Sequence, residues 1–217
     1  MAQLESNGAA SDGVRRRRHP GAAAPLPNDF YARPAEEVAR DLLGRHLWRE
    51  IDNIVCVAEI VETEAYVGPH DEASHAAERF GRTARNDVMF REPGLAYIYL
   101  IYGMHWCLNA VTDSEGFPAA VLIRAARALQ GIPALRGRRP GRSDVELLRG
   151  PGNLCRALDI DGALNGHDLR TPPLRIVAGT PVASTQVECG PRIGITRAIE
   201  QPLRYWLRDC PSVSGRR

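Results

Sequence analysis

Two glutamates and a tyrosine alternate near the end of an apolar segment, residues 60–66 (IVETEAY). The side chains of a β-strand point alternately to its two faces, so Glu62, Glu64 and Tyr66 would share one face. Burying a carboxylate without a partner is costly. Either the strand emerges at the surface and both carboxylates are solvated, or one of them is a partly buried general base. In the second case an arginine would keep the base ionised beside an aromatic ring.

A second segment, residues 97–103 (YIYLIYG), holds three of the six tyrosines of the chain. Strand alternation places Tyr97 and Tyr99 on one face and Tyr102 on the other, at a turn marked by Gly103. Tyrosines commonly pack across neighbouring strands, and that ordinary role would account for them. Alternatively, such rings can stack on a nucleobase, and a side chain at the tip of a turn can enter a base stack.

Two loops carry weaker signals. His70, Asp71 and His75 suggest a metal-dependent hydrolase, but the histidines are five residues apart rather than the four of a helical zinc motif. No helical pattern surrounds them, so we expect no metal. Arg82 and Arg85, in the segment GRTARN, fit a solvated loop and would equally suit contacts with phosphates.

The composition is that of an ordinary globular protein, with 217 residues of which 44% are hydrophobic and 25% charged. This length fits one domain with a sizeable core. No apolar run reaches the roughly 18 residues of a membrane span, and no apolar segment follows the basic N-terminal run as in a secretory signal. Five scattered cysteines without a CxxC pair indicate buried thiols in a reducing compartment. We therefore expect a cytoplasmic protein, associated with the nucleoid if its source is bacterial.

The chain contains no lysine, so all 28 basic residues are arginine. The net charge of +2 neither requires nor excludes a nucleic-acid partner. The lack of lysine does restrict the chemistry, because no lysine amine is available to form a Schiff base. A reaction at a sugar C1′ would therefore use water, unless the terminal amine takes part.

Hydrophobic periodicity and turn residues predict a mixed α/β (α+β) fold, a single domain on a largely antiparallel sheet. Residues 1–25 are expected to be a disordered basic tail, either solvated or attracted to phosphates. The domain is expected at 26–210, with a C-terminal tail at 211–217. The predicted elements are helices at 34–43 and 150–158, strands at 46–49, 54–66, 96–102, 106–111 and 119–124, an irregular loop at 67–93 and a mobile basic loop at 131–143.

Taken together and in order, these segments resemble the 3-methyladenine DNA glycosylase family of the human alkyladenine type. The resemblance covers about residues 28–210, and its most specific part is VETEAY followed some thirty residues later by a Y-x-Y-x-x-Y-G strand. The matching segments are DLLG (41–44), EIVETEAYVGPHDEASH (59–75), GRTARN (81–86), MFREPGLAYIYLIYGMHWCLN (89–109), AAVLIRAA (119–126), GPGNLCRALDI (150–160) and GPRIGI (190–195).

The resemblance implies a role for each matching residue of the catalytic site. Glu64 would be the general base that activates water for attack on C1′. Arg124 would pair with Glu64 and help to hold the water, and the backbone of Ile193 would provide a third water contact. The family commonly has lysine where this chain has Asn153, which puts one phosphate or structural contact in doubt.

The resemblance also implies a base pocket and a wedge. Tyr66, His75 and Tyr99 would stack on an extruded base, and backbone groups near Ala73 and His75 would read its edge. Asn109 would exclude guanine by crowding its exocyclic amine. Tyr102, on a protruding hairpin of a curved sheet flanked by helices, would fill the gap left in the duplex.

The implied activity is that of a monofunctional glycosylase in base excision repair. It would flip damaged purines such as 3-methyladenine and 7-methylguanine out of duplex DNA, hydrolyse the N-glycosidic bond and leave an abasic site. Activity on hypoxanthine and ethenoadenine is left open. We expect a monomer without metal or organic cofactor, whose partner is double-stranded DNA. The alternative is a non-catalytic nucleic-acid-binding module on the same sheet, which has no need of a water-activating carboxylate.

Overall fold

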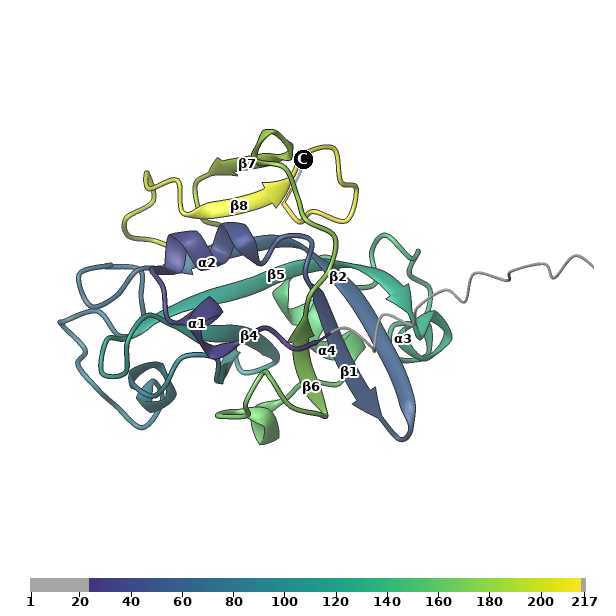
Figure 1. Ribbon diagram of the computed structural model, residues 1–217, viewed down its shortest axis with the longest axis horizontal. Helices are drawn as coiled ribbons and strands as arrows, with labels where there is room; N and C mark the ends of the chain where they lie inside the picture. Colours follow the sequence, from purple (N-terminus) through teal and green to yellow (C-terminus); the bar gives the residue numbers. More distant parts are fainter. Residues whose placement is uncertain (1–23, 216–217) are drawn as a thin grey trace, which may run out of the picture.

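The computed structural model describes residues 24–215, which form a mixed α/β domain around one antiparallel sheet (Figure 1). This confirms the predicted fold class. Of the predicted tail at 1–25, residues 1–23 lie outside the described residues, and Pro25 forms a β-bridge with Val177. The strands are β1 (His46–Ile51), β2 (Ile54–Tyr66), β3 (Ala96–Ile101), β4 (His105–Thr112), β5 (Ala119–Gln130), β6 (Leu174–Val177), β7 (Val187–Gly190) and β8 (Arg204–Leu207).

Helical segments are short. They are the α-helices α1 (Asn28–Tyr31), α2 (Ala35–Asp41), α3 (Ile132–Arg138) and α4 (Pro151–Leu158), with 3₁₀ turns η2 (Asp87–Phe90), η3 (Gly162–Leu164) and η4 (Ser184–Gln186). Helix α2 packs on β2 and β5, and α4 packs on β4 and β5. Among residues 24–215, no helix combines the length and the apolar character needed to cross a membrane.

Strand β2 is the centre of the sheet. One of its edges pairs with β5, and the other pairs first with β1 and then with β8, in a sheet ordered β3-β4-β5-β2-β1-β6. The register with β5 shifts on either side of Glu62. Such bulges bend a strand and increase its twist, and the sheet curls around its core here. Strand β2 has partner strands on both edges, and its interior residues are buried.

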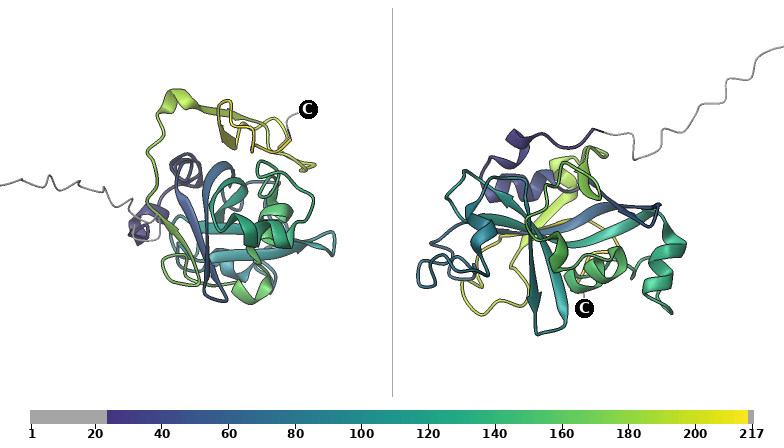
Figure 2. Two further views of the ribbon diagram at one scale, coloured as in Figure 1. Left: turned by 90° about the vertical axis from the view of Figure 1, so that its right-hand side faces the viewer. Right: turned by 90° about the horizontal axis from the view of Figure 1, so that it is seen from below.

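The β3–β4 hairpin projects from the rest of the sheet (Figure 2, right). Its tip is the turn 102–104, where Tyr102 and Gly103 have positive φ angles of 53° and 68°. Gly103 tolerates this conformation without strain. Tyr102 is 77% exposed at the tip.

Three predicted segments differ from the structure. Residues 132–138 form α3 rather than a loop, because Pro133 suits the first helical turn and Leu135 is fully buried as its anchor. Strand β5 continues to Gln130 instead of ending near residue 124. Residues 211–215, expected in a tail, pack against the domain, since Ser212, Val213 and Ser214 are buried.

Candidate active site

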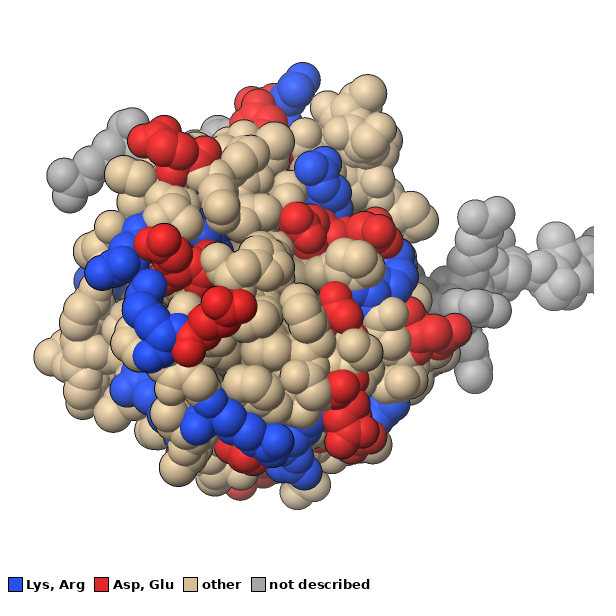
Figure 3. Space-filling view, turned by 90° about the vertical axis from the view of Figure 1, so that its left-hand side faces the viewer, with Lys and Arg blue, Asp and Glu red and all other residues tan. Residues whose placement is uncertain are grey.

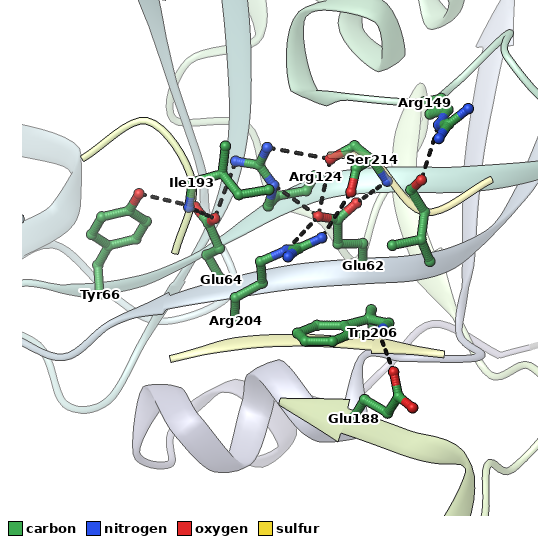
Figure 4. A network of polar contacts seen from close by, with 11 residues as sticks. Glu62, Glu64, Tyr66, Arg124, Arg149, Glu188, Ile193, Arg204, Trp206 and Ser214 are labelled. Atoms are coloured by element: carbon green, nitrogen blue, oxygen red, sulfur yellow. Dashed lines mark hydrogen bonds and ion pairs between the residues drawn. The ribbon is translucent and has the colours of Figure 1, made fainter. Parts of the chain in front are cut away.

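Glu64 lies near the end of β2 and is completely buried. Its Oε1 accepts a hydrogen bond from the backbone N–H of Ile193 at 2.7 Å and lies 3.1 Å from Nη1 of Arg124. Its Oε2 accepts a hydrogen bond from the Tyr66 hydroxyl at 3.1 Å. The carboxylate is therefore held by three donors, two on one oxygen and one on the other (Figure 4).

Burial and these partners have opposite effects on the protonation of Glu64. Burial raises the pKa of the Glu64 carboxyl above its ordinary value, while the Arg124 guanidinium and the hydrogen bonds from Ile193 and Tyr66 limit the rise. Burial alone would lower the pKa of Arg124, but Glu64 and Glu62 raise it overall. Arg124 therefore stays a cation beside a carboxylate that is easier to protonate than a solvated glutamate.

Glu62 shares the face of Glu64, as strand alternation predicted, and the two carboxylates lie on either side of Arg124. Oε1 of Glu62 accepts from Nε of Arg124 at 3.0 Å and from Nε of Arg204 at 2.7 Å. The Ser214 hydroxyl also donates to Oε1, and the Ser214 backbone N–H donates to Oε2. The interpretation in which both carboxylates are solvated is therefore wrong, because both are buried and each is held by several donors of the protein (Figure 4).

A cavity of about 520 Å³ lies beside this network. Its wall includes the three donors to Glu64, namely Tyr66, Arg124 and Ile193. It also includes the other residues for which the family resemblance implied a place in a base pocket, which are Ala73, His75, Tyr99 and Asn109. Segments far apart in the sequence thus meet around one space, and Glu64 lies directly behind the wall.

Aromatic rings form one side of the cavity. The His75 ring meets the Tyr99 ring edge-on, with 4.4 Å between centroids, and Nδ1 of His75 lies 2.9 Å from the Tyr97 hydroxyl. Burial and the nearby Arg85 lower the pKa of His75, so its ring is neutral near pH 7. Tyr66 carries the guanidinium of Arg192 over its ring at 4.8 Å, which fixes its orientation.

Asn109 is buried on β4, and its side-chain amide donates to the backbone carbonyl of Tyr97 at 2.9 Å. Because this bond joins neighbouring strands, the amide group is held in one place at the cavity wall. A rigid side chain at this position can exclude a base with an additional exocyclic group.

A buried ion pair ties together the two loops of the cavity. Nη1 and Nη2 of Arg192 lie 2.5 and 2.8 Å from the Asp71 carboxylate, and both side chains are fully buried. Asp71 also accepts from the backbone N–H of Ala73, and Arg192 precedes Ile193. From the sequence, Asp71 was predicted to matter only as a metal ligand, and Arg192 was not predicted as its partner. The two opposite charges lie 121 residues apart, so their spacing in the sequence gives no signal of the pair.

The loop 67–95 does not form a metal site in the described part of the chain. Asp71 is occupied by Arg192, and no cluster of three or more His, Cys, Asp or Glu side chains within residues 24–215 is arranged to hold a metal. The alternative of a metal site on His70, Asp71 and His75 therefore has no support in the arrangement of residues 24–215.

Tyr102 lines the cavity from the hairpin tip, although alternation placed it on the face opposite Tyr99. Its positive φ takes it out of the strand, so alternation does not apply to it. Arg82 and Arg85 lie outside the cavity wall: Arg82 pairs with Asp87, and Arg85 donates to the carbonyl of Leu100. On the face turned toward loop 67–95, basic and acidic side chains are interspersed (Figure 3).

The chain is similar to proteins of one family. The sequence profile described as Methylpurine-DNA glycosylase (MPG) matches residues 29–211. A protein of Methanocella arvoryzae is 49% identical over 195 residues, which are 88% of this chain and 96% of the relative. A protein of Myxococcus xanthus is 50% identical over 193 residues, covering 87% and 93% of the two chains. One of Streptomyces avermitilis is 45% identical over 195 residues, covering 88% and 91%. All three are provisionally named 3-methyladenine DNA glycosylases.

Proposed function

The chain belongs to the methylpurine-DNA glycosylase family, and on that premise we propose that Glu64 is the base that activates water in its reaction. As a member of this family the chain is a 3-methyladenine DNA glycosylase, a hydrolase of N-glycosidic bonds that acts on alkylated bases in base excision repair. The non-catalytic binding module is therefore not retained as an alternative. The observation that carries the proposal is a buried carboxylate with three fixed donors behind the wall of an aromatic cavity.

The donors to Glu64 support its assignment as the base. A carboxylate oxygen can accept two hydrogen bonds. Oε1 is therefore filled by Ile193 and Arg124, whereas Oε2 accepts from Tyr66 alone among the donors of residues 24–215. A water held by Oε2 would face the cavity, since Tyr66 lines it. Glu64 would take a proton from this water as its oxygen attacks C1′ of the flipped nucleotide.

The cavity supports the proposed recognition of a purine. Tyr66, His75 and Tyr99 would stack on the extruded base, the backbone near Ala73 and His75 would read its edge, and the fixed amide of Asn109 would reject guanine. Cationic bases such as 3-methyladenine and 7-methylguanine gain from electron-rich rings. Neutral lesions such as hypoxanthine and ethenoadenine would depend more on recognition of the base edge.

The product would be an abasic site in an uncut strand. Glycosylases that also cleave the strand use an amine nucleophile, which forms a Schiff base with the sugar. This chain has no lysine to form one. We propose that the protein acts as a monomer on damaged duplex DNA, with Glu64-activated water as its nucleophile.

The proposed function is tested with an end-labelled duplex that contains one hypoxanthine, and in parallel by release of 3-methyladenine from methylated DNA. Half of each duplex sample is treated with alkali, which breaks the strand at an abasic site. We expect strand breaks only after alkali. Breaks without alkali would contradict the monofunctional reaction, and no release of either base would contradict the function as a whole.

Excision is expected to depend on the ionised form of Glu64. Because burial raises the pKa of this carboxyl, the rate should fall as the pH drops through a midpoint above the ordinary glutamate value of 4.5. Single-turnover rates measured across the acidic range, after checking that the fold is intact at each pH, give this midpoint. A midpoint at or below 4.5 would argue against Glu64 as the base.

Tyr102 is expected to act as the wedge in the duplex. Its exposed ring at the hairpin tip could fill the space left by a flipped nucleotide. Contacts of the inserted ring would offset the free energy needed to unstack the bases. We expect Tyr102→Ser to weaken binding to a lesion in duplex DNA by about tenfold or more, since stacking contributes roughly 1–3 kcal/mol per base. Binding to the same lesion in a single strand serves as the control, because no gap has to be filled there.

A further inference from the structure

The C-terminal segment Ser212–Gly215 extends past residue 211, where the family profile ends. It is held in place at several points. Val213 is buried against Val61, Ala125 and Cys210, and its backbone carbonyl accepts a hydrogen bond from Nε of Arg149 at 2.9 Å.

The side chain of Ser214 belongs to the hydrogen-bond network around Arg124 (Figure 4). Its backbone N–H donates to Oε2 of Glu62 at 2.6 Å, and its hydroxyl donates to Oε1 at 3.0 Å. The same hydroxyl accepts from Nη2 of Arg124 at 3.3 Å. Ser214 therefore touches Arg124 directly and also fixes the carboxylate that binds Nε of Arg124.

The segment reaches the second donor to Glu64 as well. Gly215 has a φ of 70° and packs closely on the Ile193 side chain. A Cβ added to Gly215 would lie 2.5 Å from Cδ1 of Ile193. Nη2 of Arg204 donates to the Ser214 carbonyl at 2.8 Å, which braces the chain just before this contact. Residues 214–215 thus contact Arg124 and the side chain of Ile193, whose backbone N–H is another donor to Glu64.

We infer that residues 212–215 form a positioning segment, in which Ser214 holds Glu62 and Arg124 and Gly215 supports Ile193, so that both donors are aimed at Glu64. This inference rests on the proposed role of Glu64. Ser214 does not touch the cavity, so it acts through Arg124 and is a positioning residue. Small displacements of such donors are costly, because a misplacement of about 1 Å can slow a reaction on the order of a hundredfold.

One substitution in the whole chain and one shortened chain test the segment. Ser214→Ala removes the hydroxyl and keeps the backbone bond to Glu62 and the buried Val213, so the domain should remain folded. A chain ending at Pro211 removes the whole segment. We expect the single-turnover excision rate to fall about tenfold for Ser214→Ala and on the order of a hundredfold for the shortened chain. The control is Ser143→Ala. This substitution removes a hydrogen bond from the Ser143 hydroxyl to the Glu146 carboxylate, which has a similar length but lies on the surface.

Binding and pH dependence separate positioning from a loss of stability. In a Glu64→Gln background, affinity for the lesion duplex should be the same whether residue 214 is serine or alanine.

The pH dependence of excision reports on the groups around Glu64. The titratable or charged groups that face Glu64 are Glu62 and Tyr66 of β2, Arg124 of β5, Cys107 of β4 and Arg192 of the loop before Ile193. If Arg124 is held less well, the pKa of Glu64 should rise further, and the acidic limb of the rate profile should move to higher pH.

The outcomes are distinct. A slower rate with a shifted acidic limb and unchanged affinity supports the positioning segment. An unchanged rate in both variants, or a rate lowered by the same factor at every pH in proportion to the folded fraction, overturns it while the proposed function stands. If the unaltered protein releases no base, the proposed function fails first and the inference fails with it.

Discussion

Replacing Glu64 with glutamine should abolish excision while leaving the protein folded and able to bind damaged DNA. General-base catalysis contributes up to about 10⁴ in rate, and we expect a loss of at least about a thousandfold. The fold should tolerate the change because glutamine can still accept from Ile193 and Arg124 at Oε1, while the Tyr66 hydroxyl can accept from its amide. Arg124 would also keep Glu62 as a partner.

Single-turnover excision and duplex affinity measure the two parts of this prediction separately. Glu37→Gln, which changes an exposed glutamate of α2, is the matched control and should retain the rate. Near-native turnover by Glu64→Gln would remove Glu64 from its proposed role. A loss of both excision and binding would indicate instead that the substitution disturbs the cavity.

Removing the carboxylate of Asp71 should have the largest effect on stability. Asp71→Ala would leave the guanidinium of Arg192 buried without its counter-charge, and breaking a buried pair in this way typically costs about 3–5 kcal/mol in the free energy of unfolding. Among residues 24–215, Arg192 would retain the carbonyl of Ala65 at 3.0 Å, a long contact to Gln201 and the ring of Tyr66, none of which carries a negative charge. Urea unfolding followed by tryptophan fluorescence measures this loss.

The matched control is Asp87→Ala, because its partner Arg82 is 55% exposed and such surface pairs contribute about 0–1 kcal/mol. Replacing both members, Asp71→Ala with Arg192→Met, should recover part of the stability, since no unpaired charge remains. Equal losses for Asp71→Ala and Asp87→Ala would contradict the importance of burial. Because the pair joins the loops that carry Ala73 and Ile193, excision should also slow in Asp71→Ala.

The local pattern of the sequence determined the strands that carry the chemistry. Alternation in β2 placed Glu62, Glu64 and Tyr66 on one face, and the structure has the strand at the predicted residues 54–66. The predicted helix at 150–158 is α4, and the turn after Ile101 is where the hairpin reverses. These features depend on neighbours in the sequence, through side-chain periodicity and turn geometry, so they could be read without the fold.

The tertiary structure decided which carboxylate could face a substrate. Alternation left Glu62 and Glu64 equivalent, and only the resemblance to a family selected Glu64. In the fold, β8 and the C-terminal segment bring Arg204 and Ser214 to Glu62, whereas Glu64 meets the residues of the cavity wall. No local signal predicts those contacts, because they join residues up to 152 positions apart.

Long-range contacts also explain two segments whose structure differs from the sequence-based prediction. The basic stretch 131–143 contains a helix because Leu135 finds a buried site in the assembled domain. Residues 212–215 pack on the domain because Val213 is buried in an apolar cluster and Ser214 donates to the Glu62 carboxylate. The sequence by itself determined the strands, their facing side chains and a chemistry without lysine. The pairing of distant charges, which depends on how the sheet curls and which strand lies beside β2, was decided only by the tertiary structure.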